Sequence, residues 1–224
     1  MKKLIMITIA SLALMSCKKD AEPLTLRNSV EITYGQTEPL NASHQCTYNS
    51  LDTIVASVSS AGLITAHRIG TTKVTATSNE TGERAECTVT VTPRSNLYKL
   101  PIAVRYELEY TVKALETREL IAGGNGILVY AGENAKVRKV MYQFEQLELK
   151  SIDVMLQNTI TVENEAMQFL EERYTYLGEI DYKAFAFSEG DMILVLNTDA
   201  SLGLNVLYFW SDGKSAINYK KYMN

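Results

Sequence analysis

Apolar and polar residues alternate in short runs between residues 24 and 93, with turn-forming residues between the runs. In the last run, Cys87, Val89 and Val91 occupy every second position. Successive side chains of a strand point to opposite faces of a sheet, so these three side chains should share one inward face. Short strands with turn signals between them predict an all-β sandwich over residues 24–93.

Residues 97–224 combine helical and strand spacing. Leu108, Val112 and Leu115 recur at helical spacing, and the glycine-rich run 123–126 should end that segment. Three strands are then expected at residues 127–130, 140–144 and 147–156.

A second helix should follow, with Asn164 as its N-cap and Gly178 as its stop. Its apolar stripe would consist of Met167, Leu170, Tyr174 and Leu177. Three more strands are expected at residues 185–187, 192–196 and 204–210. The order of helix, three strands, helix and three strands predicts an α+β module, in which an antiparallel sheet is covered on one face by two helices.

The aromatic residues divide the chain at the same place. Tyr34 and Tyr48 are the only two of the 19 aromatic residues that precede Tyr98. The run Pro93-Arg94-Ser95-Asn96 has the chemistry of a loop. We therefore expect a first domain at residues 24–93 and a C-terminal module at residues 97–224.

The N-terminus has the pattern of an export signal. Lys2 and Lys3 precede the apolar stretch Leu4 to Leu14, which is shorter than the roughly 20 residues that a membrane-spanning helix needs. The run Leu14-Met15-Ser16-Cys17 resembles a bacterial lipobox. The resemblance implies that residues 1–16 are a signal peptide and that Cys17 becomes the lipidated first residue. A chance cysteine beside an apolar run is the alternative.

Residues 17–23 form a short polar tether in this interpretation. Lys18 stands where an Asp would signal retention in the inner membrane, which favours the outer membrane. Lys19, Asp20 and Glu22 partly match the surface-export signal of Bacteroidota lipoproteins, although a merely solvated tether fits them equally well. The expected location is therefore the bacterial outer membrane, with exposure on the cell surface left open.

Residues 24–93 resemble the group 2 bacterial Ig-like domain. The matching runs are Tyr34-Gly35-Gln36-Thr37, Val55-Ala56-Ser57-Val58, Gly62-Leu63-Ile64-Thr65-Ala66, Gly70-Thr71-Thr72-Lys73-Val74-Thr75-Ala76 and Cys87-Thr88-Val89-Thr90-Val91. Tyr48 stands where the family usually has a core Trp, and it can fill that space provided that its hydroxyl finds a partner. Domains of this family serve as spacers, stalks and adhesive modules.

The module at residues 97–224 is similar, by the order of its elements alone, to the repeats of the β-lactamase-inhibitor protein and of small outer-membrane assembly lipoproteins. That similarity involves no residue motif, and it implies no ligand.

The remaining cysteines, Cys46 and Cys87, would form a pair in an oxidising envelope. In the strand order of the Ig-like family, both should point inward from strands that come close together. The resemblance therefore implies a disulfide between Cys46 and Cys87. Two buried free thiols that act as small apolar side chains are the alternative.

Few residues offer catalytic chemistry. His44 and His67, the only two histidines, lie beside strands without a Ser-Asp or Cys-His arrangement nearby. Glu163, Glu165 and the pair Glu171-Glu172 are best interpreted as a solvated helix face. The run 123–126 lacks the Lys and Ser or Thr of a phosphate loop. We expect no catalytic, cofactor-binding or metal site.

Charge and one tripeptide add two expectations. The formal net charge is −4, and the one short basic run, Lys136 to Lys139, gives nucleic-acid binding no electrostatic basis. Asp52-Thr53-Ile54 resembles the short O-glycosylation sequence of exported Bacteroidota proteins, which would make Thr53 a glycosylation site.

Three functions compete on these grounds. The favoured one is a lipid-anchored, non-enzymatic binding, adhesion or structural protein, in which the Ig-like domain is a spacer. Its partners would be the membrane, through Cys17, and a protein or glycan, because the C-terminal module is rich in Tyr. The alternative is an inhibitor or assembly-factor-like protein that binds one protein through the C-terminal sheet. A hydrolase comes third, because the module at residues 97–224 contains neither His nor Cys.

Overall fold

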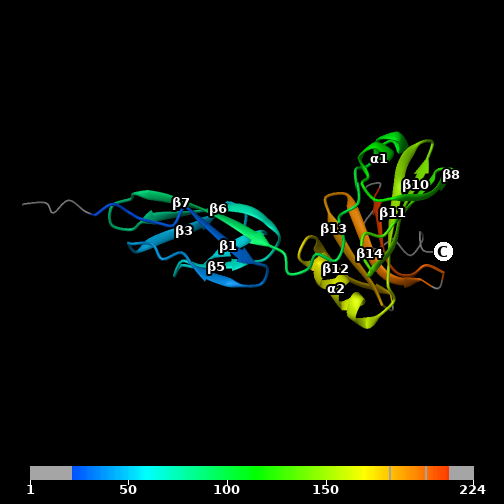
Figure 1. Cartoon of the computed structure of the whole chain (residues 1–224). Coiled ribbons are helices and arrows are strands. Elements are labelled where there is room, and N and C mark those ends of the chain that lie inside the picture. The colour runs from blue at the N-terminus through cyan, green and yellow to red at the C-terminus, as the bar shows by residue number, and fades with distance from the viewer. Residues whose placement is uncertain (1–21, 182, 200, 212–224) are drawn as a thin grey trace, which may run out of the picture.

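The computed structural model describes residues 22–181, 183–199 and 201–211. Cys17 and the predicted signal peptide therefore lie outside the described residues. Figure 1 shows that the described chain forms two parts, which are joined end to end by a short linker. Within the described ranges, neither helix is long and apolar enough to cross a membrane.

The first part is a sandwich of two sheets. One sheet has the order β1 (Ser29–Thr33), β7 (Arg84–Thr92), β6 (Gly70–Ser78) and β3 (Cys46–Ser50); the other has the order β2 (Thr37–Pro39), β5 (Leu63–Ala66) and β4 (Ala56–Val58). Cys87, Val89 and Val91 are all buried between the sheets, as their alternation predicts. This core accounts for the strict period-two pattern of β7.

The second part is built on one eight-stranded antiparallel sheet. Its order is β12 (Thr175–Asp181), β13 (Ala184–Glu189), β14 (Met192–Asp199), β15 (Gly203–Trp210), β11 (Glu148–Leu156), β10 (Val137–Glu145), β9 (Ile127–Ala131) and β8 (Leu120–Gly124). Two four-stranded meanders therefore meet where β11 pairs with β15, with Val154 opposite Val206.

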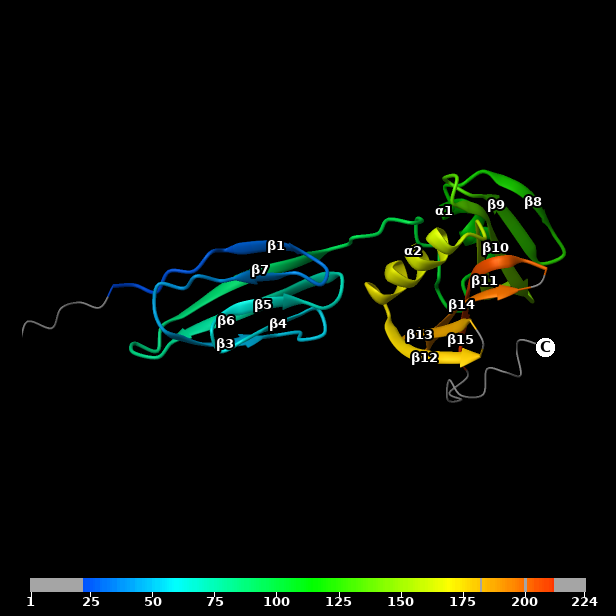
Figure 2. The ribbon, with the colours of Figure 1, turned by 90° about the horizontal axis from the view of Figure 1, so that it is seen from below.

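Two helices complete the second part, α1 (Glu109–Leu115) and α2 (Ile160–Glu171). Val112 of α1 and Phe169 of α2 belong to the same buried core, which also contains Val154 and Val206 of the sheet. Both helices therefore pack on one face of the sheet, as predicted, and Figure 2 shows α2 lying across that face.

Each half of the second part has four strands instead of the three that the sequence predicted. The two missed strands are β8 and β12, and β8 ends at Gly124, inside the glycine-rich run that was predicted only to end the first helix. Asn125 and Gly126 have φ angles of 51° and 74°, the left-handed values of a two-residue hairpin turn. The glycine-rich run therefore joins β8 to β9, and it does not end a helix.

Both predicted helices are present, but their bounds, caps and buried residues differ from the prediction. The N-cap of α2 is Thr159, whose hydroxyl accepts a hydrogen bond from the Val162 N–H, and Asn164 lies inside the helix. The helix ends at Glu171, so Tyr174 and Leu177 lie beyond its end, and Gly178 is not its stop but a residue of β12. In α1 only Val112 is buried, whereas Leu115 is 60% exposed.

The predicted disulfide is absent, because Cys46 and Cys87 are free, buried thiols. Cys46 on β3 is opposite Ser78 of β6, and Cys87 on β7 is opposite Val74 of the same strand. Strand β6 lies between the two cysteines, so two strand spacings, about 10 Å, separate them even before the register offset is counted. A disulfide requires Cα atoms within about 7 Å. The alternative of two small apolar side chains agrees with this arrangement.

Candidate functional site

The junction between the two parts contains a dense group of buried polar contacts. At its centre is Glu172, which directly follows α2 and is completely buried. One of its carboxylate oxygens accepts hydrogen bonds from the N–H groups of Arg94 and Ser95, at 3.0 and 3.2 Å. The other oxygen accepts one from the Gln168 side chain at 2.9 Å. The Glu172 carboxylate therefore holds the linker against the end of α2.

Arg173 binds the same linker through a different group. Its guanidinium donates to the Ser95 carbonyl at 3.0 Å and to the Phe169 carbonyl at 2.9 Å. The guanidinium carbon also lies 3.7 Å from the centre of the Phe169 ring. Burial lowers the pKa of Arg173, and the neighbouring Glu172 carboxylate opposes that effect. Both the N–H and the carbonyl of Ser95 are thus bonded to the second part.

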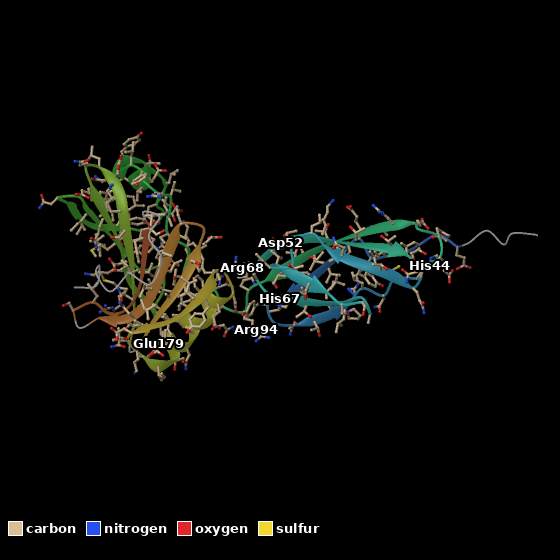
Figure 3. The ribbon with its side chains drawn as sticks, turned by 180° about the vertical axis from the view of Figure 1, so that it is seen from behind. His44, Asp52, His67, Arg68, Arg94 and Glu179 are labelled. Carbon is tan, nitrogen blue, oxygen red and sulfur yellow. The ribbon has the colours of Figure 1, made fainter. Side chains whose placement is uncertain are left out.

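The end of the sandwich contributes two further contacts. The Ile69 N–H donates to the Glu172 carbonyl at 2.9 Å, and the Arg68 guanidinium donates to the Thr175 hydroxyl at 2.5 Å. Figure 3 shows Arg68 and Arg94 at the end of the sandwich that faces the second part. The two parts therefore touch directly as well as through the linker.

Beyond the linker, the chain enters the core of the second part. Leu97 and Tyr98 are almost completely buried. The Tyr98 ring lies 4.3 Å from the Phe169 ring, and its hydroxyl is 2.7 Å from the hydroxyl of Tyr208. Residues on both sides of Ser95 are therefore fixed, which leaves the junction without a loose connecting segment.

The sequence-based interpretation of Glu171 and Glu172 as a solvated face was wrong for Glu172. Glu171 and Glu172 are adjacent residues of the same type, so the sequence does not show which of them is buried. The linker partners of Glu172 are 77 and 78 positions earlier in the chain. Arg173 and Tyr98 were missed for the same reason. Their roles depend on tertiary contacts that no local pattern reports.

A second buried polar cluster surrounds Arg118 in the second part. Its guanidinium donates to Glu116 at 2.9 Å and to Glu133 at 2.8 Å, and the Tyr142 hydroxyl donates to Glu116 at 2.5 Å. Burial by itself would raise the pKa values of Glu116 and Glu133, but these hydrogen bonds lower both overall. The carboxylates are held as paired anions, which suits a structural role better than proton transfer.

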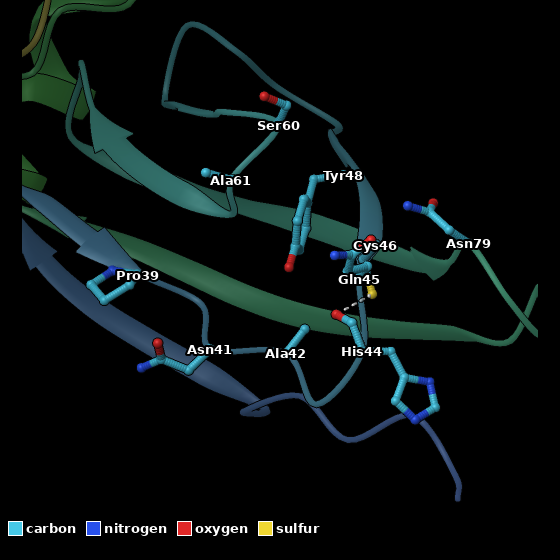
Figure 4. A pocket seen from close by; sticks show the side chains of 10 residues that line it. All are labelled: Pro39, Asn41, Ala42, His44, Gln45, Cys46, Tyr48, Ser60, Ala61 and Asn79. Carbon is cyan, nitrogen blue, oxygen red and sulfur yellow. Dashed lines mark hydrogen bonds between the residues drawn. The ribbon is translucent and has the colours of Figure 1, made fainter. Parts of the chain in front are cut away.

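A pocket of about 490 Å³ lies at the opposite end of the sandwich, where Figure 3 labels His44. Figure 4 shows Tyr48 projecting into it from β3, with Ala42 and Ala61 on either side. Polar side chains at its border include Asn41, Gln45 and Asn79. None of the described residues that line the pocket is Asp, Glu, Lys or Arg.

Tyr48 packs against the sandwich core, as the family pattern suggests. Burial raises the pKa of Tyr48, and the nearby Cys46 adds to this rise. A side chain at Gly62 would lie 2.8 Å from the Tyr48 ring, so glycine keeps this space open.

The other sequence candidates lie apart from one another. The His44 Nδ1 atom is 3.3 Å from the Ser78 hydroxyl at the pocket end of the sandwich, and the His67 Nε2 atom is 2.7 Å from the Ser57 hydroxyl. Thr53 is exposed in a turn that the Asp52 carboxylate stabilises by accepting the Ile54 N–H at 2.9 Å. Its glycosylation stays a prediction.

The described part of the chain contains no group of three or more His, Cys, Asp or Glu side chains that could hold a metal ion. The junction and the Arg118 cluster are built to hold elements together, and the Tyr48 pocket is uncharged. The junction is therefore the candidate site with the clearest mechanical consequence.

Comparison with known families finds that residues 28–89 match the model of the bacterial Ig-like domain (group 2). The first part of the chain is therefore an Ig-like domain, as its sequence indicates. A domain of this kind fits a non-enzymatic surface or structural role. Comparison with curated proteins finds no match.

Proposed function

We propose that this protein is a lipid-anchored, non-enzymatic protein of the bacterial outer membrane. In this proposal Cys17 carries the lipid, the Ig-like domain is a rigid spacer, and the second part binds a protein or glycan partner. The lipobox resemblance supports the anchor, and the family match of residues 28–89 supports the spacer.

The observation that carries the spacer role is the double attachment of Ser95. Its N–H and carbonyl bond to Glu172 and Arg173 respectively, over 3.2 and 3.0 Å. A flexible linker would leave such groups in water and let the two parts turn independently. Here the linker is held on both sides, so the Ig-like domain can set the distance and direction of the second part from its anchor.

The spacer role predicts that both parts tumble as one body. NMR relaxation of the chain from residue 18 onward should give one rotational correlation time for the Ig-like domain and the second part. Glu172→Gln should separate the two values, and Glu171→Gln should not, because no hydrogen bond joins Glu171 to the linker in the described part of the chain. Two independent correlation times in the unmodified protein would contradict the spacer role.

The anchor needs a separate test in a bacterial host that processes lipoproteins. Wild-type protein should partition into detergent with a lipid on Cys17, and Cys17→Ala should abolish this lipid and leave uncleaved or mislocalised precursor. Normal processing and detergent partitioning of Cys17→Ala would contradict the anchor. That result would leave the rigid junction untouched, because the described contacts do not involve residue 17.

A further inference from the structure

Four exposed apolar side chains lie together on the second part, and we refer to them as the tyrosine patch. Its members and their exposed fractions are Val104 (53%), Tyr106 (48%), Tyr110 (71%) and Leu147 (66%). Large apolar side chains scattered singly on a surface need no explanation, but a group of them marks an interaction site.

The patch is continuous because the segment before α1 runs beside the β10–β11 turn. The Glu109 N–H donates to the Leu147 carbonyl at 3.0 Å, and the Leu149 N–H donates to the Glu107 carbonyl at 2.8 Å. The Lys150 ammonium lies 4.8 Å from the Tyr106 ring centre. Figure 1 shows α1 beside this end of β10. Tyr106, Tyr110 and Leu147 therefore share one surface.

Two members of the patch are displayed on left-handed backbone. Tyr106 has a φ of 59°, and the β10–β11 turn has φ angles of 53° at Gln146 and 71° at Leu147. Residues other than Gly and Asn occupy this region only at an energetic cost, because the side chain crowds the backbone. The chain thus carries local strain at both sites.

Another hairpin of the same protein has a turn sequence that suits left-handed backbone. Asn125-Gly126 joins β8 to β9 with similar φ angles, and Asn-Gly is the preferred sequence there. At the β10–β11 turn, Leu147 occupies the position that Gly126 takes in the other hairpin, although its side chain is mostly exposed. Neither backbone preference nor internal packing therefore accounts for a leucine at residue 147.

The charges around the patch indicate what kind of surface fits it. The nearby cations Arg105, Lys113 and Lys150 are paired with Asp191, Glu109 and Glu148. Glu107 and Glu145 have no ion-pair partner among the described residues, so the border of the patch is negative. A negative border disfavours an anionic membrane surface and favours a basic one.

We propose that the tyrosine patch is the docking surface for a protein partner that offers an apolar socket with a basic border. Leu147 and Tyr110, the most exposed members, would enter the socket. This proposal rests on the binding role proposed above for the second part.

The test places a photo-crosslinking amino acid at residue 147, 110 or 177 of the full chain, in cells that anchor it. Leu177 is the control, because it is an exposed leucine on the edge strand β12 of the same part, and three strands separate β12 from β11. The expected result is the same partner protein captured from residues 147 and 110 and not from residue 177. Capture from residue 177 alone would contradict docking at the tyrosine patch but would agree with a binding role for the second part. Capture from none of the three residues would contradict both proposals.

The captured protein is then purified and its Kd measured. Leu147→Gly and Tyr110→Ser should each weaken binding about tenfold or more, as loss of an interface anchor does, and Leu177→Ser should leave the Kd unchanged. Equal Kd values for all variants would overturn the proposal. A second test uses vesicles of phosphatidylethanolamine and phosphatidylglycerol. If the protein binds these vesicles and Leu147→Gly abolishes the binding, the patch is a membrane contact and the proposal is wrong.

Discussion

The N–H of Ser95 donates a 3.2 Å hydrogen bond to the carboxylate of Glu172, which has no exposed surface. Both Glu172 oxygens accept hydrogen bonds, one from the linker N–H groups and one from the Gln168 amide. A glutamine at this position would keep one acceptor oxygen for the linker N–H groups, but it would lose the negative charge that also lies 3.5 Å from the Arg173 guanidinium. The junction therefore depends on the charge state and the shape of one side chain.

Glu172→Gln should lower the free energy of unfolding by about 1–3 kcal/mol, because the linker N–H groups would bond to a neutral acceptor and Arg173 would lose its charged partner. Glu171→Gln is the matched control, and it should change the stability by less than about 0.5 kcal/mol. Urea unfolding of both variants measures the difference. Equal stabilities would show that the linker bonds contribute nothing to folding.

The cysteines give a chemical prediction. Because β6 separates them, the unfolded, unreduced chain from residue 18 onward should show two reactive thiols. Cys87→Ala should destabilise the Ig-like domain by about 1 kcal/mol, since Cys87 is completely buried in the sandwich core. A thiol reagent assay in denaturant checks the first claim. Protein that reacts only after reduction would contradict it.

Gly132 supports a third prediction. A Cβ atom there would lie 1.8 Å from the Val137 carbonyl oxygen, so Gly132→Ala must move main chain. We expect a loss of about 3 kcal/mol. Gly190→Ala is the control, because Gly190 has a φ of 60° but no atom within 4 Å of a Cβ. It should lose only about 1 kcal/mol, the cost of the left-handed backbone. Trp210, the only tryptophan, reports unfolding of the second part. Equal losses would refute the clash.

Local pattern predicted much of the fold. The alternation of Cys87, Val89 and Val91 fixed the inward face of β7, and helical spacing located α1 and α2. The hairpin turn at Asn125-Gly126 could also have been predicted, since that dipeptide is the strongest short-range hairpin signal. It was obscured by Gly123 and Gly124, which are poor strand formers.

The site could not be predicted in the same way. Glu171 and Glu172 are adjacent and chemically identical, and only the fold decides that Glu172 meets the linker. The pairing of the cysteines failed for a related reason, because alternation predicts which face a side chain takes and not which strands are neighbours. Long-range order of this kind lies beyond what a single-sequence pattern contains.

The last prediction concerns acid. Glu116 and Glu133 have folded-state pKa values below their ordinary values, because hydrogen bonds from Tyr142 and Arg118 outweigh the cost of burial. A carboxyl with a lowered folded pKa stabilises the fold fully above its unfolded pKa, about 4.3 for Glu. That contribution is lost as the pH falls through the folded pKa. The stabilisation that Glu116 and Glu133 contribute should therefore be intact at about pH 5 and be lost as the pH falls below about 4.

Urea unfolding at about pH 7, 5 and 3.5, followed through Trp210, measures this dependence. Glu133→Gln removes one of the two titrating groups, so its stability should be lower at neutral pH and should fall less steeply in acid. Both effects follow from the same ion pair, because the Arg118 guanidinium loses a charged partner whether Glu133 is replaced or protonated. If the stability of the wild-type protein rises as the pH falls from about 5 to 3.5, the pKa values of Glu116 and Glu133 are not lowered by folding and the prediction is wrong.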